Sequence, residues 1–567
     1  MTAGISRVRR LVSRPATSRP RPAAHDREGY ASLFAGDRSA PHWAVDYARR
    51  LAERHPASHV IVIQTSMSPT GPFHVGNFRD TACAHLVHRA LLRMGRRSQI
   101  LLSFDDYDPV RPGSVPGQDG RCLGALGERS RRLCRQYLAE LTRAGICPPD
   151  LDADGRGAHA QWQTHYQHQR YLAGEYATLQ RTYQRDAARL TALLNGSRPE
   201  RLFAVYCEAC GRNTTTIEVL GSERVGYRCR SCGTARATTD PGPVKPIWAV
   251  DWTLRVAHEG IDCEPAGQDH CTAGSTMDRT RPVFSDYLHR PQPVIIPYGL
   301  VREPGQHRKI SGSTGGGLRL GDLLDVMPAR MVLWLYGRAP ARSDIRIGLD
   351  WATMHAAYAA FDAFVDAAAH GGRAAALHEL VTDDPPHARL PRWRSVLGAL
   401  HASSYDPAAA CEHLVPADSP LRALVAERVE HARAWLARHG RDRCWIVRDV
   451  AADRPAGPEI PTAAGVPPEP SGPSGHRPPG PSSELFPGGP AELAPQVSPE
   501  QIYRALFGTR CGPPLRRVRE QFGAAQVATA LAAASEGAGD RPHEPGVWRS
   551  VVLARLAVPQ AQVPDAG

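Results

Sequence analysis

The sequence predicts an α/β protein, with a parallel sheet covered by helices and followed by a mostly helical region. Residues 58–64 are a β-branched run, and residues 99–104 are a second one; both are typical of strands. A Gly/Pro loop and a helical stretch over residues 77–94 lie between them. Strand, loop, helix and strand in this order make a βαβ unit, which favours a parallel sheet. Residues 351–450 are rich in Ala, Leu and Arg and predict helices.

Composition narrows the class of protein. The chain has 567 residues, 42% hydrophobic and 22% charged, and no apolar run approaches the ~18 residues of a membrane-spanning helix. The 69 basic residues exceed the 57 acidic ones, and the net charge of +12 favours a polyanionic partner. Only two of the basic residues are lysines, Lys245 and Lys309. Nothing at the start of the chain is typical of a signal peptide, so we expect a cytoplasmic protein that does not bind membranes.

The remaining segments complete the predicted organisation. Residues 127–145 and 158–195 predict mostly helix, and residues 293–298 predict a strand. We expect six regions, which are a basic disordered extension (1–40), a catalytic domain (41–345), a cysteine-containing insertion within it (200–240), a helical domain (350–452), a Pro/Gly/Ser-rich linker (453–497) and a C-terminal helical segment (498–540).

Four of the thirteen cysteines are clustered. They form two Cys-x-x-Cys-Gly turns separated by 18 residues, which is a zinc-ribbon spacing: Cys207, Cys210, Cys229 and Cys232. Glycine after each pair lets backbone amides wrap around thiolate ligands. Four thiolates make a closed tetrahedral site for structural Zn²⁺, which would fold a knuckle without a core of its own. The alternative is four unrelated free cysteines.

Two loops have the composition of phosphate-binding segments. Residues 68–77 run from the first strand into a helix, whose N-terminal amides favour an anion. His74 and Asn77 lie on its first turn, where both can point at a phosphate. Residues 309–317 combine a lone lysine with hydroxyls and glycines, as in a lid that closes on a triphosphate. An incidental Gly/Pro turn is the alternative for the first loop.

Together these segments resemble a known family. His74-Val75-Gly76-Asn77 is similar to the "HIGH" motif of class I aminoacyl-tRNA synthetases, and residues 309–313 to their "KMSKS" motif. Further segments resemble the class I lysyl-tRNA synthetases in order along the chain: His42-Trp43-Ala44, residues 105–109, the paired cysteine turns, Trp248 to Trp252, Glu264 to His270, Pro297-Tyr298, and Ile502 to Leu506 with Gly512-Pro513.

The resemblance implies a Rossmann-like catalytic domain with a zinc-ribbon insertion, followed by an all-α anticodon-binding domain. It implies activation of lysine with ATP and Mg²⁺ and transfer to tRNA, by a chain for which a monomer is favoured. The implied catalytic residues are His74, Asn77, Lys309 and Ser311. The implied ATP-binding residues are Pro69, Gly71, Gly76, Ile310 and Ser313. The implied amino-acid pocket comprises Asp269, His270, Tyr298, Trp248 and Trp252, although ordinary core packing is the alternative for Tyr298 and the tryptophans.

Several positions depart from the family's pattern. The loop has Thr314 where a second lysine is usual, and Gln268, Gly299 with Leu300, and Val256 replace other usual residues. The chain is therefore expected to be a lysyl-tRNA synthetase, a paralogue that takes a lysine analogue or inhibitor, or an enzyme for another amino acid or a biosynthetic pathway. A non-catalytic tRNA-binding protein and a zinc-ribbon DNA-binding factor are alternatives of another class.

Overall fold

The computed structural model describes residues 42–304 and 317–439. Predictions for residues 1–40, for the loop with Lys309, Ile310, Ser311, Ser313 and Thr314, and for residues 453–540 lie outside this part of the chain. The chain divides into two compact units between Ala388 and Arg389, and each is described by itself.

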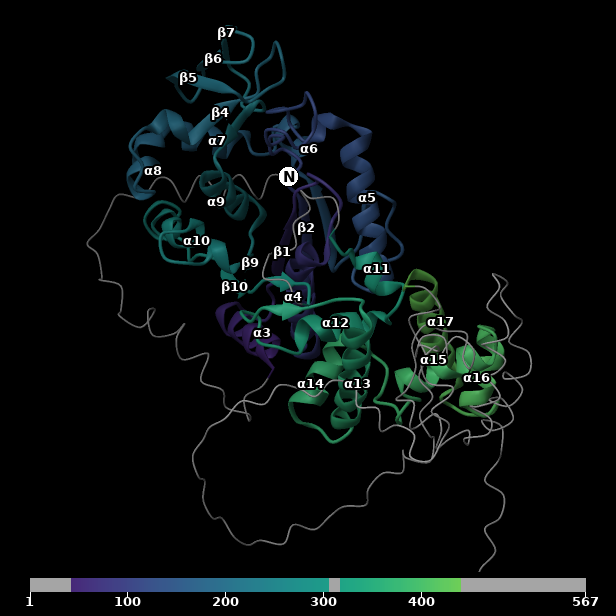
Figure 1. The fold of residues 1–567 in the computed structure, drawn as a ribbon. Helices are drawn as coiled ribbons and strands as arrows, with labels where there is room; N and C mark the ends of the chain where they lie inside the picture. Colours follow the sequence, from purple (N-terminus) through teal and green to yellow (C-terminus); the bar gives the residue numbers. More distant parts are fainter. Residues whose placement is uncertain (1–41, 305–316, 440–567) are drawn as a thin grey trace, which may run out of the picture. The chain divides into compact units, whose positions relative to one another are not determined.

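A five-stranded parallel sheet organises the first unit (Figure 1). Its spatial order is β10-β9-β1-β2-β3, with bounds β1 Ile61–Met67, β2 Ser98–Phe104, β3 Trp162–Tyr166, β9 Cys263–Gly267 and β10 Val294–Tyr298. This is the doubly wound order, in which the direction of winding reverses between β1 and β9. The expected α/β class and Rossmann-like parallel sheet are confirmed.

Helices cover both faces of this sheet. Ser98 Oγ lies 2.9 Å from His88 Nδ1 of α4 (Val75–Arg93), so that face of β2 is turned to α4. Leu101, on the opposite face, packs in a cluster with Trp252 and Val256 of α9 (Trp248–Glu259). Successive side chains of a strand point to opposite faces. The sheet is therefore buried between layers, as parallel sheets usually are.

Two strands differ from the sequence prediction. The expected helix over residues 158–195 is wrong at its start, because β3 joins the sheet there before the helices begin. This strand is polar (WQTHY) and lies at the sheet edge, so it carries no apolar alternation that predicts a strand. β1 begins three residues later than expected, since His59 and Ser58 belong to the preceding turn. By contrast, β2 and β10 lie within a residue of the predicted bounds.

The other elements of the first unit surround this sheet. The remaining helices are α3 Trp43–Arg54, α5 Glu128–Arg143, α6 Gln167–Leu172, α7 Ala177–Arg185, α8 Ala187–Leu193, α10 Thr276–Arg279, α11 Leu320–Leu324, α12 Ala329–Gly337, α13 Trp351–Ala368 and α14 Gly372–Val381. The remaining strands form three small sheets: β4 Phe203–Val205 with β8 Val244–Pro246, β5 Thr215–Leu220 with β6 Val225–Cys229 and β7 Ala235–Thr238, and β11 Val301–Arg302 with β12 Ile345–Arg346.

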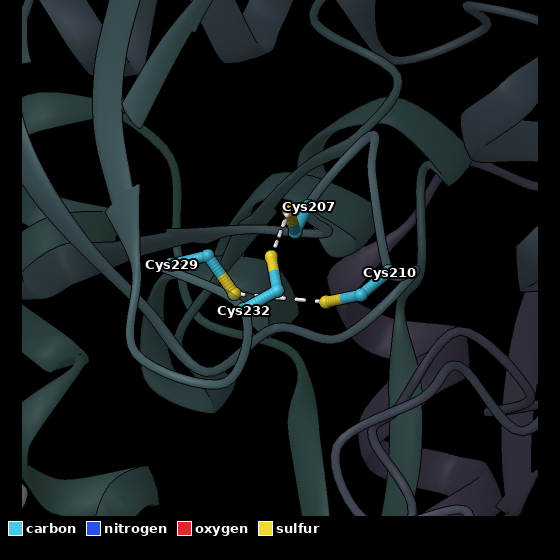
Figure 2. Close-up of side chains that lie close together, drawn as sticks. All are labelled: Cys207, Cys210, Cys229 and Cys232. Atoms are coloured by element: carbon cyan, nitrogen blue, oxygen red, sulfur yellow. Dashed lines mark hydrogen bonds between the residues drawn. The ribbon is translucent and has the colours of Figure 1, made fainter. Parts of the chain in front are cut away.

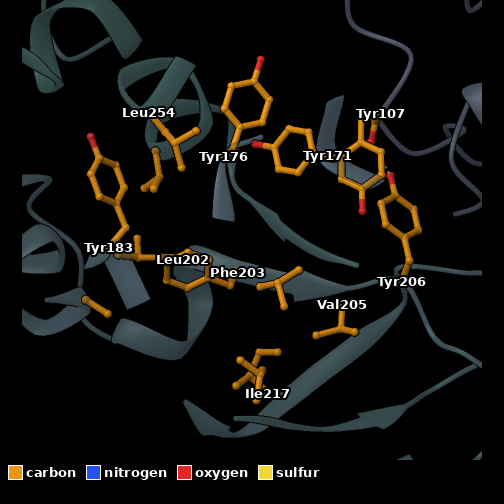
Figure 3. Packing of buried hydrophobic residues seen from close by; sticks show 14 of the residues in the cluster. Tyr107, Tyr171, Tyr176, Tyr183, Leu202, Phe203, Val205, Tyr206, Ile217 and Leu254 are labelled. Carbon is orange, nitrogen blue, oxygen red and sulfur yellow. Dashed lines mark hydrogen bonds between the residues drawn. The ribbon is translucent and has the colours of Figure 1, made fainter. Parts of the chain in front are cut away.

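The cysteine-containing insertion shares a core with the helices beside it. Figure 3 shows this cluster, in which tyrosines of α6, α7 and the loop after β2 meet apolar residues of β4 and β5. The rings of Tyr107 and Tyr171 stack with centroids 4.3 Å apart. Val205 and Ile217 of the insertion are buried in the same cluster. The insertion thus packs on the rest of the first unit and does not depend on a core of its own.

The second unit is helical where it is described, over residues 389–439. Its helices are α15 Trp393–Ala402, α16 Pro407–Leu414 and α17 Arg422–His439. Trp393 and Trp435 meet edge to face, with centroids 6.3 Å apart. The helices α13 and α14 belong to the first unit, because α14 packs on α12 and α4. Within residues 42–304 and 317–439, no helix is long and apolar enough to cross a bilayer.

Candidate active site

The winding of the sheet singles out one place for a ligand. In doubly wound sheets, ligands bind outside the carboxyl ends of the strands, where the winding direction reverses. Here that place lies between β1 and β9. The loop after β1 leads into α4, and η4 (Gln268–His270) follows β9 directly. Both loops carry residues that the sequence singled out.

His74 caps the start of α4. Its Nδ1 accepts a hydrogen bond from the Gly76 amide at 3.0 Å, and Asn77 Oδ1 accepts one from the His74 amide at 3.1 Å. A Cβ at residue 76 would lie 2.8 Å from the imidazole, so the cap requires Gly76. Because Nδ1 is an acceptor, a neutral His74 carries its proton on Nε2, which can then donate to an anion. The sequence predicted that the side chains of both His74 and Asn77 can point at a phosphate. In the structure, the Asn77 side chain instead accepts the hydrogen bond from the His74 amide that completes the helix cap.

The first loop and the flank of the second one meet at this helix. The Val75 amide donates to the Leu318 carbonyl at 2.8 Å. Leu318 comes nine residues after Lys309, which itself lies outside the described residues. Of the other expected nucleotide-binding residues, Pro69 is buried and Gly71 is half-buried in the loop between β1 and α4.

Asp80, which the sequence reasoning missed, lies two turns into α4. Thr65 of β1 donates a hydrogen bond to its carboxylate, and the side chain of Tyr298 makes a second hydrogen bond to it. Burial raises the pKa of Asp80 to about 7. Within the described part of the chain, no arginine, lysine or histidine forms an ion pair with it. The carboxylate therefore has neutral hydrogen-bond donors but no counter-ion.

Glu264 of β9 is a second buried carboxylate of this kind. Trp252 Nε1 donates to it at 2.7 Å and Gln64 Nε2 at 3.0 Å. Burial raises the pKa of Glu264 to about 8. Gln64 directly precedes Thr65 in β1, so Glu264 and Asp80 lie on opposite faces of the sheet. The sequence contained Glu264 within a motif but nothing in its pattern indicated an unpaired carboxylate.

The structure places the expected amino-acid-binding residues at four separate positions. Tyr298 ends β10 and contacts Asp80, while Asp269 and His270 are exposed in η4. Trp252 is enclosed in the core, where it packs edge-on against Phe284, so core packing describes it. Trp248, at the start of α9, is half-buried under the Arg255 guanidinium, 5.3 Å from the ring centroid.

Gly299 has a structural reason to depart from the family's pattern. A Cβ there would lie 2.5 Å from the Arg342 carbonyl oxygen and 2.6 Å from the Ser343 carbonyl carbon. The chain leaving β10 therefore runs too close to residues 342–343 for a side chain. Val256 is fully buried behind the sheet and Gln268 is exposed.

A buried ion network lies near the carboxyl end of β2. Lys245 Nζ is 2.7 Å from Asp251 and 3.3 Å from Asp108, and Arg255 donates to Asp105 at 2.6 Å. Burial opposes ionisation of Asp251, but the charges of Lys245 and Arg255 hold its pKa below the usual range. The ammonium also lies over the rings of Tyr107 and Tyr171, at 5.8 and 5.5 Å from their centroids. This network joins β2 to α9 and to the strand that leaves the insertion.

The four clustered cysteines converge (Figure 2). Cys207 Sγ lies 3.7 Å from Cys232 Sγ, and Cys210 Sγ lies 3.6 Å from Cys229 Sγ. Four thiolates around one zinc at ~2.3 Å stand about 3.8 Å apart, so this set fits the ion. The glycine after each pair has a positive φ, +70° at Gly211 and +74° at Gly233, and donates its amide to the first cysteine's carbonyl.

Sheet order, helix start and the sequence motifs define a nucleotide-binding α/β protein of the class I synthetase type. The family model described as "tRNA synthetases class I (K)" matches residues 41–120 and 157–382. The chain belongs to this family.

Curated proteins with similar sequences are named as lysine–tRNA ligases. A "Lysine--tRNA ligase" of Pyrococcus furiosus is 30% identical over 326 residues, covering 54% of this chain and 61% of that protein. A "Lysine--tRNA ligase" of Treponema pallidum is 27% identical over 335 residues, with the same coverage. The match thus spans about three fifths of the length of these relatives. Among solved structures, a glutamate-tRNA synthetase from Elizabethkingia anophelis aligns with a TM-score of 0.30 and 13% identity over 67% of this chain and 97% of that one.

Proposed function

We propose that this chain activates lysine with ATP and transfers it to tRNA. The observation that carries this proposal is the Asp80–Tyr298 pair, a buried carboxylate that has no counter-ion among residues 42–304 and 317–439 and lies beside the carboxyl edge of the sheet. A lysine substrate brings the ammonium groups that such a carboxylate lacks. The family membership and the names of the relatives support the same reaction.

The nucleotide would bind where α4 begins. Its first-turn amides and dipole favour phosphate, and the tautomer of His74 that the cap selects has its proton on Nε2. Lys309 would neutralise charge on the leaving pyrophosphate, by its resemblance to the family's loop, and Mg²⁺ would accompany ATP. These groups position and stabilise charge, and the reaction needs no protein nucleophile.

The reaction would have two steps. In the first, a carboxylate oxygen of lysine attacks the α-phosphorus of ATP, and the bond to the bridging oxygen breaks to release pyrophosphate. In the second, a terminal ribose hydroxyl of tRNA attacks the lysyl carbonyl carbon and AMP leaves. Asp80 would hold an ammonium group of lysine, oriented by Tyr298, with Asp269 and His270 nearer the exposed edge.

The four cysteines would hold a structural Zn²⁺ ion. Their sulfur separations support this, and four thiolates leave no open position for a substrate. The helical second unit and the excess of basic residues in the chain support contact with the tRNA. The helical unit would bind the anticodon region of the tRNA.

Pyrophosphate exchange into ATP, measured with a panel of amino acids, tests the proposal. We expect exchange that depends on lysine, and at least a tenfold lower rate for Lys309→Ala with tRNA affinity nearly unchanged. No exchange with any amino acid would contradict the proposal and favour a tRNA-binding protein without catalysis. An unchanged rate for Lys309→Ala would contradict the role given to the loop.

A second candidate is a paralogue that takes a lysine analogue. The close approach of residues 342–343 to Gly299, where the family usually has a larger residue, favours it because it leaves no room for a side chain directly after Tyr298. Exchange with ornithine or a β-lysine-like analogue, in preference to lysine, would identify this activity.

A further inference from the structure

A second cluster of metal-ligating side chains lies at the other edge of the sheet. His55 directly follows α3, His59 lies two residues before β1, and Asp262 directly precedes β9. Because β1 and β9 are parallel, their amino ends share the edge opposite the candidate active site. This cluster is therefore separate from the nucleotide site and from the four cysteines.

Distances within the cluster are close to those of a metal site. His59 Nε2 lies 2.8 Å from Asp262 Oδ2, and His55 Nε2 lies 3.6 Å from Asp262 Oδ1. One ligand atom of each residue lies within 4.8 Å of the others. Ligands bound tetrahedrally at ~2.0 Å stand about 3.3 Å apart, so small side-chain rotations would complete the geometry. The two imidazole rings stack with centroids 4.6 Å apart, which keeps both on one side of the carboxylate.

The bonding of His55 also leaves room for a ligand. Its Nε2 is buried and has no hydrogen-bond partner, since 3.6 Å is too long for a hydrogen bond to Asp262. Asp262 is held in place by the Val62 amide, which donates to Oδ2 at 3.0 Å. The His59 side chain is 37% exposed, so water can reach a further coordination position.

We propose that His55, His59 and Asp262 bind a divalent transition-metal ion. Two imidazole nitrogens and one carboxylate suit Zn²⁺, Co²⁺ or Ni²⁺ better than Ca²⁺ or Mg²⁺, which take oxygen ligands. The ion would link the end of α3 to the starts of β1 and β9, across a separation of more than 200 residues. Its role is to stabilise this edge of the catalytic domain.

Neighbouring cations set the expected affinity. Arg54 and Arg96 act electrostatically on His55, and Arg290 acts on Asp262. The positive charges of these arginines oppose the binding of a divalent cation, and one carboxylate, that of Asp262, offsets this repulsion. The ion should therefore bind more weakly than zinc at the four thiolates, and a chelator should remove it first.

The test is a titration of Co²⁺ into the full chain, loaded beforehand with one Zn²⁺ per molecule. We expect one further Co²⁺ to bind, with visible d–d absorption but without the intense thiolate-to-cobalt charge-transfer band that replacement at the cysteines would give. The melting temperature should rise with Co²⁺ or Zn²⁺. His59→Gln should weaken this binding at least tenfold and remove the thermal shift.

His370→Gln, at an exposed histidine after α13, is the matched control and should leave the binding unchanged. His59 is the residue to replace first, because Asp262 also binds the Val62 backbone and its loss could unfold β1. Asp262→Asn, with folding checked by circular dichroism, should likewise weaken binding. Saturation at a single metal, or equal Co²⁺ affinity in His59→Gln and the unsubstituted chain, would overturn the proposal.

Discussion

Two regions of the first unit contain buried carboxylates whose partners differ. Near the end of β2, Asp251 and Asp105 are paired with Lys245 and Arg255. Beside β1, the hydrogen-bond donors that Asp80 and Glu264 find among the described residues are neutral. All four side chains are buried, but within the described part of the chain only Asp251 and Asp105 of these four form ion pairs.

The pKa values of Asp251, Asp80 and Glu264 follow this difference. Cations hold the pKa of Asp251 below its usual range, whereas burial raises that of Asp80 to about 7 and that of Glu264 to about 8. A paired carboxylate has its counter-charge in the chain itself, and the pair stabilises one arrangement of the elements that carry it. An unpaired carboxylate indicates a partner supplied from outside or a group kept protonated. The first region is thus structural, and the second contains the candidate substrate-binding group.

Removing the cation of the paired region should have the largest effect. Lys245→Met leaves Asp251 buried without its nearest cation, and breaking a buried pair costs about 3–5 kcal/mol. Denaturant titration of the full chain measures the loss. The control is Arg49→Met, whose exposed pair with Asp46 should contribute about 0–1 kcal/mol. Equal losses in the two variants would remove the distinction between a buried and an exposed pair.

In the unpaired region, Glu264 should make the free energy of unfolding depend on pH. The pKa of Glu264 is raised in the folded chain, so folding binds a proton between about pH 4.5 and 8, and stability falls as pH rises through that window. Glu264→Gln should remove up to about 4 kcal/mol of this decline. The difference in unfolding free energy between the two chains at pH 5 and pH 9 measures it. A difference that does not change with pH would show that Glu264 is ionised throughout.

Much of the fold was predictable from sequence, because β1, β2 and β10 are short apolar runs and α4 follows a Gly/Pro loop between two of them. The convergence of the four cysteines was predictable because they come in two pairs with fixed spacing. β3 was not, since an edge strand with one solvent-facing side tolerates the polar run WQTHY. In the sequence, Gly299 was only a departure from the family's pattern, and the approach of the backbone at 342–343 explains it.

The unpaired carboxylates could not be recognised for a different reason. Asp80 has the sequence surroundings of a solvated helix face, with Arg79 before it and Thr81 after it. The structure buries all three, because α4 is covered by the sheet on one side and by α12 and α14 on the other. Lys245, one of only two lysines, stood out in composition, but its partners are distant in sequence or hidden in a helical pattern.

Amino-acid binding should distinguish the two unpaired carboxylates from each other. If Asp80 holds an ammonium group, it must lose its proton first, so lysine affinity should rise up to about tenfold per pH unit below pH 7 and level off above it. Asp80→Asn should abolish this rise and weaken binding. Glu264→Gln, on the opposite face of the sheet, is the control and should keep the rise. Calorimetric titration with lysine from pH 5.5 to 8.5 measures both, and a pH-independent affinity in the unsubstituted chain would exclude Asp80.

The smallest expected effect concerns the hydroxyl that contacts Asp80. Tyr298→Phe removes one hydrogen bond to this carboxylate, which contributes about 0.5–1.5 kcal/mol, and keeps the packing of the ring. That bond favours the ionised form, so its loss should raise the pKa of Asp80 further and move the pH at which lysine affinity levels off to a higher value. Stability should change little. If Tyr298→Phe weakens lysine binding without shifting its pH profile, Tyr298 contacts the substrate directly. The proposal that Tyr298 acts through the pKa of Asp80 would then be wrong.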